Sequence, residues 1–224
     1  MRPELFDTDL LAFERTIFGN DPAQILHSIL GTGASAHIIA WLYALFIVFL
    51  PLSLALILVF SPRLQIGTFF VTAQCINWAL GAASYFLIPA LGPIYADPSL
   101  FDSLPHTEAT RLQDMLLDDR VAFLSHVDHG PLQAIAAFAS LHIAMSFTVA
   151  LAAQILHFGT RWLRFALWTW LGITLVATVY LGWHYVIDDV AGIAMGAIAL
   201  FAASALTGFD LRAERRSKLQ SEAA

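Results

Sequence analysis

Charged side chains are scarce in this chain, and their scarcity excludes an ordinary water-soluble fold. Asp, Glu, Lys and Arg together make up 12% of the 224 residues, whereas hydrophobic residues make up 58%. A soluble domain of this length could not bury so much apolar side chain. The composition therefore indicates an integral membrane protein, and no nucleic-acid partner is expected.

The chain has only one cysteine, and its sequence shows neither a signal peptide nor an internal repeat. The single cysteine, Cys75, allows no intramolecular disulfide, and its apolar surroundings indicate a core residue. Residues 1–9 are acidic and lack the basic start and apolar core of a cleaved signal peptide. We therefore expect later apolar segments to direct membrane insertion.

Long apolar segments are what the chain has instead. Three segments of about 27 residues each are long enough to cross a bilayer as helices of about 40 Å. Two more follow on either side of a tight Trp183–His184 junction, which predicts a helical hairpin. The five segments cover residues 34–60, 65–91, 132–158, 162–182 and 185–209. The expected fold class is an all-α, polytopic transmembrane helix bundle with about five spanning helices.

The remaining segments are more polar. Residues 7–29 alternate apolar and polar side chains and contain Gly19 and Pro22, which predicts an interfacial helix with a break. A long polar outer loop is expected at residues 92–130, and ordered loops of this length are usually functional. The expected division is an N-terminal interfacial segment, a transmembrane domain and a charged tail: residues 1–33, 34–209 and 210–224.

Basic residues are divided unevenly between the two sides of this five-helix arrangement. One side holds seven of them: Arg63, Arg161, Arg164, Arg212, Arg215, Arg216 and Lys218. The other side holds four, alongside most of the acidic residues: Arg2, Arg15, Arg111 and Arg120. The positive-inside rule places the first side in the cytoplasm. The outer loop and the hairpin junction are therefore predicted to face the non-cytoplasmic side of the plasma membrane.

Three ionisable side chains lie at the ends of apolar spans, where they are costly and by default functional. His142 lies in the third span, and His184 and Asp188 lie in the hairpin, on the same predicted side of the membrane. If the helix begins at or before His184, the i,i+4 spacing of His184 and Asp188 puts both side chains on one helix face, close enough for the carboxylate to accept a ring N–H. That bond would fix the tautomer and leave the other ring nitrogen to attack.

Two histidines and one carboxylate allow one imidazole to attack phosphorus while the other protonates the leaving oxygen, near neutral pH. Other interpretations remain open. A single histidine in an apolar helix is often only packed, and a His–Asp pair can act as a structural clamp between helices. The same three side chains would also suffice for zinc, with His126 and His129 as additional ligands.

Two segments about forty residues apart, Ser140-Leu-His142 and His184-Tyr-Val-Ile-Asp188-Asp-Val-Ala-Gly192, carry a resemblance. They resemble the second and third signature motifs of the type 2 phosphatidic acid phosphatase superfamily. They are similar to the branch that includes fungal inositol phosphorylceramide synthase, where Ser-Leu-His replaces the commoner Ser-Gly-His. The stretch Tyr85-Phe-Leu-Ile-Pro-Ala-Leu-Gly-Pro93 also looks like a segment of that branch. The resemblance extends over roughly residues 85–192.

The resemblance implies a role for each residue of the two motifs. His184 would be the nucleophile that forms a phosphohistidine, Asp188 would orient it, and His142 would protonate the leaving group. Ser140 would donate to a phosphoryl oxygen. The family is metal-independent, so neither a metal nor another cofactor is expected. Its members act on lipid phosphates or exchange phospho-head-groups, so a membrane lipid is the expected substrate.

The chain departs from the family's phosphatase branch at its phosphate-binding cations. No basic residue lies near Pro89, Thr178 stands six residues before the nucleophile where Arg is usual, and Ala139 replaces a usual Pro. Without these cations a dianionic monoester would be poorly neutralised, whereas a phosphodiester carries a single charge. Arg111 and Arg120 of the outer loop are candidates to bind the substrate and supply the missing charge.

The sequence therefore predicts a membrane-embedded lipid phosphotransferase, with a small alcohol such as inositol, or water, as acceptor. The alternative among enzymes is a lipid phosphate phosphatase that acts on phosphatidic acid or a polyprenyl phosphate. The alternative outside enzymes is a lipid transporter, although the sequence shows neither an inverted repeat nor polar residues on both sides. Three further polar residues are expected at the entrance of the site or at a helix cap: His126, Asp128 and His129.

Overall fold

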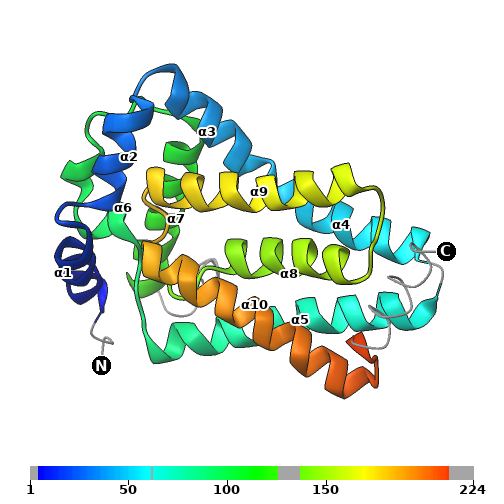
Figure 1. Cartoon of the computed structure of the whole chain (residues 1–224). Coiled ribbons are helices and arrows are strands. Elements are labelled where there is room, and N and C mark those ends of the chain that lie inside the picture. The colour runs from blue at the N-terminus through cyan, green and yellow to red at the C-terminus, as the bar shows by residue number, and fades with distance from the viewer. Residues whose placement is uncertain (1–4, 62, 126–136, 212–224) are drawn as a thin grey trace. The chain divides into compact units, whose positions relative to one another are not determined.

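The computed structural model is built from helices and describes residues 5–61, 63–125 and 137–211 (Figure 1). Over these ranges it contains no strand. The first five helices are α1 (Asp7–Phe18), α2 (Pro22–Leu30), α3 (Ala34–Ala44), α4 (Phe46–Phe60) and α5 (Leu64–Leu87). Those that follow are α6 (Pro93–Ala96), the 3₁₀ helix η1 (Pro98–Phe101), α7 (Glu108–Ser125), α8 (Leu141–Ile155), α9 (Arg161–Tyr180) and α10 (Val186–Thr207).

Four helical segments among the described residues are long and apolar enough to cross a membrane. They are Ala34–Phe60, Leu64–Leu87, Arg161–Tyr180 and Val186–Thr207. The first of these consists of α3 and α4, which are separated by a turn at Leu45. The predicted fold class, an all-α bundle of membrane helices, is confirmed.

The fifth expected span corresponds to a shorter helix than the hydropathy suggested. α8 has 15 residues, which gives about 22 Å at the usual rise per residue. Residues 137–140 are not helical, and residues 132–136 lie outside the described part of the chain. Ser140 has extended torsion angles (φ -62°, ψ 107°) and is the N-cap, a position that serine favours. His142 therefore lies in the first turn of α8.

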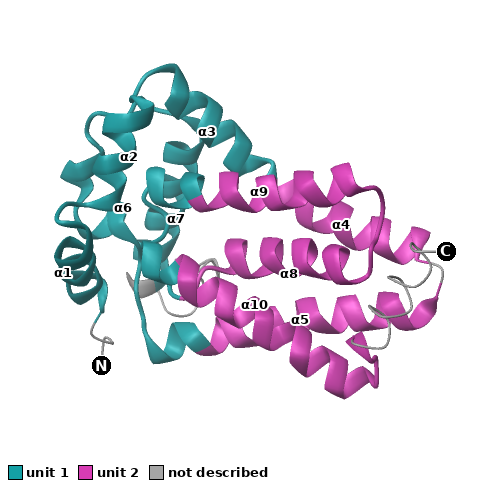
Figure 2. Ribbon diagram, in the orientation of Figure 1, with its two compact units in different colours: residues 1–45, 84–138, 176–188 teal, residues 46–83, 139–175, 189–224 magenta. Residues whose placement is uncertain are grey.

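The described chain forms two compact units (Figure 2). Unit 1 comprises Met1–Leu45, Ser84–Phe138 and Val176–Asp188. Unit 2 comprises Phe46–Ala83, Ala139–Leu175 and Asp189–Ala224. His184 and Asp188 belong to unit 1, and Ser140 and His142 belong to unit 2.

The two N-terminal helices of unit 1 are separated by the break that Gly19 and Pro22 predicted. Gly19 closes α1 in the left-handed conformation (φ 72°), and Pro22 is the first residue of α2. The buried side chains of α1 are Asp7, Leu11 and Glu14, which share one helix face. That face carries two carboxylates into unit 1.

The polar stretch 92–130, expected as a loop, is largely helical where it is described. α6 and η1 begin at prolines, and α7 begins after Thr107, whose hydroxyl accepts the Thr110 N–H at 3.4 Å. α7 packs against α3. Its inward face is a narrow stripe of Ala109, Leu112 and Leu116, which the surrounding acids obscured in the sequence.

The core of unit 2 surrounds α8, of which ten of the 15 residues are buried. The rings of Phe69 in α5 and Phe209 stack with their centroids 4.8 Å apart. Asn77 Nδ2 of α5 donates to Thr148 Oγ1 of α8 at 2.9 Å, and both side chains are fully buried. Buried polar pairs of this kind hold helices together inside a membrane.

Two glycines let α10 approach α8 closely within unit 2. A β-carbon on Gly192 would lie 2.5 Å from the Ser140 carbonyl oxygen, and one on Gly196 would lie 2.7 Å from the Ala144 carbonyl oxygen. This is the small-xxx-small spacing that allows backbones of membrane helices to pack together. The backbone at the start of α8 is thereby held against α10.

Candidate active site

His184 lies in a tight turn between α9 and α10 that Gly182 makes possible. Gly182 has a φ of 74°, and a β-carbon there would lie 2.5 Å from the Phe101 ring. The N–H groups of Trp183 and His184 donate to the Thr178 carbonyl at 2.9 and 3.3 Å. α10 begins at Val186, so His184 precedes the helix and is fixed by backbone bonds to α9.

His184 and Asp188 lie together, and both are buried. Their side chains are 5% and 0% exposed, and His184 Nδ1 lies 3.6 Å from Asp188 Oδ2. That distance suits an ion pair and is longer than a hydrogen bond. The same Oδ2 accepts the Tyr185 N–H at 2.9 Å. Asp188, the third residue of α10, thus serves as the acidic half of a capping box while it faces His184.

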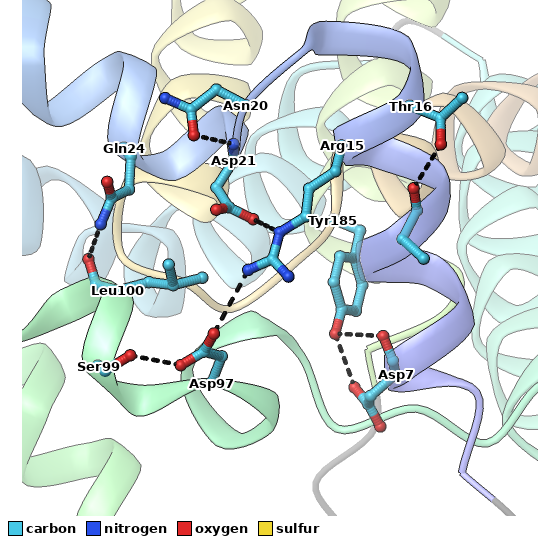
Figure 3. Close-up of polar contacts among 11 residues, drawn as sticks. Asp7, Arg15, Thr16, Asn20, Asp21, Gln24, Asp97, Ser99, Leu100 and Tyr185 are labelled. Carbon is cyan, nitrogen blue, oxygen red and sulfur yellow. Dashed lines mark hydrogen bonds and ion pairs between the residues drawn. The ribbon is translucent and has the colours of Figure 1, made fainter.

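Asp7 of α1 holds the same turn through Tyr185 (Figure 3). The Tyr185 hydroxyl donates a hydrogen bond to Asp7 Oδ1 at 3.1 Å. The same oxygen accepts the Leu91 N–H at 3.0 Å and the Gly92 N–H at 2.9 Å. Burial raises the pKa of the Tyr185 hydroxyl well above its usual value, and Asp7 raises it further. Tyr185 therefore stays protonated and acts as a donor.

Glu14 places a second carboxyl of α1 at the start of α10. It is 2% exposed, and its Oε1 accepts the Ile187 N–H at 3.1 Å. Burial raises the pKa of Glu14 from 4.5 to about 7, although hydrogen bonds from the Ile187 and Val186 N–H groups lower it. The charges of Asp188 and Asp21 add to the rise. This carboxyl therefore changes its charge near neutral pH.

Arg15, next to Glu14 in the sequence, is engaged by two acids (Figure 3). Its Nε donates to Asp21 Oδ1 at 2.7 Å, and its Nη2 donates to Asp97 Oδ2 at 3.4 Å. The hydrogen bond with Asp21 is the main reason that the pKa of Arg15 rises above its usual value. Arg15 thus links α1 to the start of α2 and to the residue before η1.

Ser140 and His142 lie in unit 2 at the start of α8. Ser140 is fully buried, and within the described residues its Oγ makes no hydrogen bond. The half-buried ring of His142 packs on Phe46 with the centroids 4.5 Å apart. The first N–H groups of a helix have no partner within the helix and carry partial positive charge. This end of α8 therefore offers donors suited to an anion.

The two arginines proposed for substrate binding lie on α7 in unit 1. Arg111 Nη1 donates to Glu108 Oε1 at 2.9 Å, and these side chains are 76% and 75% exposed. Arg120 is half-buried. A surface ion pair of this kind contributes little stability, so Arg111 can exchange Glu108 for another anion at little cost.

Unit 1 also contains a cavity of about 260 Å³ beside the polar stretch. Its polar lining consists of Asp102, His106, Thr107, Thr110 and Gln113. Gln113 Nε2 donates to the carbonyl of Leu181, which also lines the cavity, at 2.8 Å. Among the described residues that line it, none is Lys or Arg, so the cavity suits a neutral polar molecule better than a phosphate.

Zinc binding was one of the interpretations that the sequence left open. Among the described residues, no group of three or more His, Cys, Asp or Glu side chains is arranged to hold a metal ion. His126, Asp128 and His129 lie outside the described residues, so their expected place at the entrance stays a prediction.

The contacts of Asp7, Glu14 and Tyr185 around the His184 turn were not predicted from the sequence. The available signal was the heptad spacing of Asp7 and Glu14, with Leu11 between them, which puts all three on one face of α1. That spacing does not show that the face is buried. The partners of the two acids are mainly backbone N–H groups distant in sequence, and no side-chain pattern reveals those.

Comparison with known protein families gives a match over most of the chain. A family model described as the PAP2 superfamily matches residues 8–202. The matched region includes every helix from α2 to α9 and contains Ser140, His142, His184 and Asp188. No curated protein and no solved structure matches the chain.

Proposed function

The chain belongs to the PAP2 superfamily, and from that premise we propose that it is a lipid phosphotransferase that acts through a phosphohistidine. Membership supports a phosphatase or phosphotransferase activity in general, and the apolar helices fit an integral membrane protein. The observation that carries the proposal is the buried His184–Asp188 pair in the turn before α10. It lies within the matched region and has the residue types that nucleophilic catalysis requires.

In the first step His184 attacks the phosphorus of a lipid donor. Because Nδ1 faces Asp188, Nε2 is the nitrogen that forms the P–N bond. The P–O bond to one alcohol of the donor breaks, and protonated His142 gives the departing oxygen its proton. With a phosphodiester donor, the phosphorus on His184 keeps its other ester. Asp188 stabilises the positive charge that develops on the phosphorylated imidazole.

In the second step the acceptor takes the phosphoryl group from His184, and the proton moves in the opposite direction. Neutral His142 takes the proton of the acceptor hydroxyl, and the hydroxyl oxygen attacks phosphorus. The P–N bond breaks and His184 regains its lone pair. A small alcohol as acceptor completes a head-group transfer, whereas water completes a hydrolysis.

Helix dipoles and hydroxyls take the place of the usual phosphate-binding cations in this proposal. The first N–H groups of α8 and the buried Ser140 hydroxyl bind phosphoryl oxygens. Arg111 and Arg120 add positive charge from α7. Because Thr178 carries none, a singly charged phosphodiester is favoured over a dianionic monoester. This is the reason for placing head-group transfer ahead of monoester hydrolysis.

The acceptor is a small polyhydroxy alcohol such as inositol, and the 260 Å³ cavity of unit 1 is its proposed binding site. The lining supplies hydroxyl, amide, imidazole and carboxylate groups, which match an uncharged molecule with many hydroxyls. Leu181, in the wall of this cavity, is three residues before His184 in the chain. An Asp102→Asn variant should therefore raise the KM for the alcohol and leave the KM for the lipid unchanged.

The proposed location is the plasma membrane, with the site on its non-cytoplasmic side. Seven of the eleven basic residues fall on the side that the positive-inside rule assigns to the cytoplasm. A lipid donor would then be taken from the outer leaflet. The polar stretch that lines the acceptor cavity would face the same aqueous phase.

A lipid screen that compares head-group exchange with phosphate release tests the proposal. Purified protein is incubated with phosphodiester lipids or phosphatidic acid labelled in the phosphate, with and without inositol. We expect label to move to the alcohol faster than free phosphate appears, and His184→Ala to abolish both. Release of phosphate from monoesters alone would establish the phosphatase instead. Full turnover by His184→Ala, or turnover of no lipid class, would refute the proposal.

A further inference from the structure

Glu14 is a buried acid to which the proposed chemistry gives no role. It lies on α1, far in sequence from the Ser140–His142 and His184–Asp188 motifs, and is 2% exposed. Burying a carboxyl is costly unless a charge or several hydrogen bonds compensate. A carboxyl kept at this cost beside candidate catalytic groups is a candidate for a function of its own.

Glu14 and Asp188 hold the first turn of α10 from two directions. Glu14 Oε1 accepts the Ile187 N–H at 3.1 Å, and Asp188 Oδ2 accepts the Tyr185 N–H at 2.9 Å. Both N–H groups belong to the end of the helix that has no acceptor of its own. A carboxyl from α1 and a carboxyl from α10 itself therefore cap the same helix start.

Glu14 and His184 also line one small cavity, of about 10 Å³, close to the space that a single water needs. Among the described residues, the titratable groups around Glu14 are Asp21 just before α2, His184 from the turn and Asp188 from α10. Tyr185 also interacts with its charge. The remaining walls of the cavity are apolar. Glu14 and His184 thus share a small, largely apolar space.

We propose that Glu14 is a positioning residue of this site, which holds the first turn of α10 so that Asp188 stays against His184. The ionised carboxylate is the active form because it is the stronger acceptor at a helix N-terminus. Protonation weakens this cap and removes a negative charge beside the imidazole that becomes positive on phosphorylation. The inference rests on the proposed phosphotransfer and adds to it a residue from the N-terminal helices.

The titration of Glu14 gives this role a signature that a merely structural carboxyl would not have. Its pKa of about 7 in the folded chain exceeds the ordinary 4.5. The folded state therefore holds the proton more tightly, and the stability that this proton contributes is lost as the pH rises from about 4.5 to about 7. Above pH 7 the ionised carboxylate lowers stability while, in this proposal, it raises turnover.

The test compares Glu14→Gln with Asp9→Asn. The glutamine keeps an oxygen that can accept the Ile187 N–H but removes the charge, whereas Asp9→Asn removes a charge from an exposed position of the same helix. Transfer and thermal unfolding are measured on both sides of pH 7. We expect Glu14→Gln to lower kcat at pH 8 about 10- to 100-fold. We also expect kcat of this variant to change less with pH below pH 7 than kcat of the wild type. The KM of this variant for the lipid should be unchanged. Its unfolding temperature at pH 8 should be equal to that of the wild type or higher.

Three results would overturn the inference. They are a wild-type pH profile in Glu14→Gln, an equal loss of activity in Asp9→Asn, and a loss of kcat matched by a loss of stability. Hydrogen exchange provides a test without turnover: Glu14→Ala should speed exchange of the Ile187 amide, and Asp9→Ala should not. Unchanged exchange in Glu14→Ala refutes the positioning role whatever the substrate is. If wild-type protein turned over no lipid, the proposed function alone would fail.

Discussion

At the scale of single residues, the turn that carries His184 is held by acids. Asp188, Glu14 and Asp7 each accept a hydrogen bond from a residue of the segment 185–187. The N–H groups at the start of α10 carry partial positive charge and partly compensate for the negative charge of these three acids. Nearby negative charge favours the cationic form of an imidazole. The surroundings of His184 therefore suit a nucleophile that becomes positively charged when it attacks.

Replacing Asp188 by asparagine should keep its hydrogen bond from the Tyr185 N–H and remove its charge from beside His184. The amide oxygen of the introduced side chain can still accept the Tyr185 N–H, so the start of α10 should persist. The negative charge beside His184 is lost, and we expect Asp188→Asn to lower kcat about 10²- to 10⁴-fold with little change in the unfolding temperature. Steady-state transfer and thermal unfolding are measured together, with Asp118→Asn on the exposed surface of α7 as the control. Retention of more than half the activity would exclude an electrostatic role for Asp188.

At the scale of secondary structure, hydropathy predicted the membrane helices but not the helices of the polar stretch 92–130. A helix that is apolar on every side stands out in the sequence, as α4 and α10 do. α7 does not, because only a stripe of it is apolar. The length of α8 was overestimated because apolar residues continue before the N-cap, and hydropathy does not register where helical torsion angles begin.

In the candidate site, too, some contacts were predictable from the sequence and others were not. The proximity of His184 and Asp188 was predicted from an i,i+4 spacing on one helix face. His184 in fact lies before α10, and the tight turn after α9 brings its side chain to Asp188. The contributions of Asp7 and Glu14 were not predictable, since each acid reaches a segment more than eighty residues away in sequence. Such contacts depend on tertiary packing, which one sequence does not encode in any local pattern.

The glycine contact between α10 and α8 gives a prediction for the helix pair in unit 2. In Gly196→Val the new β-carbon would lie 2.7 Å from the Ala144 carbonyl oxygen, so the helices must separate. We expect a loss of about 1–3 kcal/mol in the free energy of unfolding, as for other overpacked contacts. The matched control is Gly172→Val in α9, where a β-carbon meets nothing within 4 Å. Equal effects of the two changes in denaturant unfolding would mean that the close approach is unimportant.

At the scale of the whole chain, the N-terminal helices, the polar stretch and the His184 turn belong to one compact unit. The segment before the first spanning helix therefore contributes to the surroundings of His184 through Asp7 and Glu14. Truncation of α1 would remove both acids and expose the start of α10. The N-terminal segment is accordingly part of the catalytic architecture, in this account, and not only a membrane-surface anchor.

The orientation of the chain can be tested with its single cysteine removed. In a Cys75→Ser background, Asp102→Cys and Arg161→Cys each provide one thiol on opposite predicted sides of the membrane. The charge distribution predicts that a membrane-impermeant maleimide labels the Asp102→Cys variant in intact cells and labels the Arg161→Cys variant only after permeabilisation. The reverse pattern would place the polar stretch in the cytoplasm. Labelling of both variants in intact cells would refute the five-span arrangement.

The most direct test of the central claim is the capture of the covalent intermediate. Purified protein is mixed with a lipid labelled in its phosphate, quenched with alkaline detergent, and digested for mass spectrometry. Our account predicts an acid-labile, alkali-stable phosphoryl group on His184 that appears within one turnover, disappears when acceptor alcohol is added, and is absent from His184→Asn. A label on another residue, or turnover by His184→Asn at the wild-type rate, would contradict it.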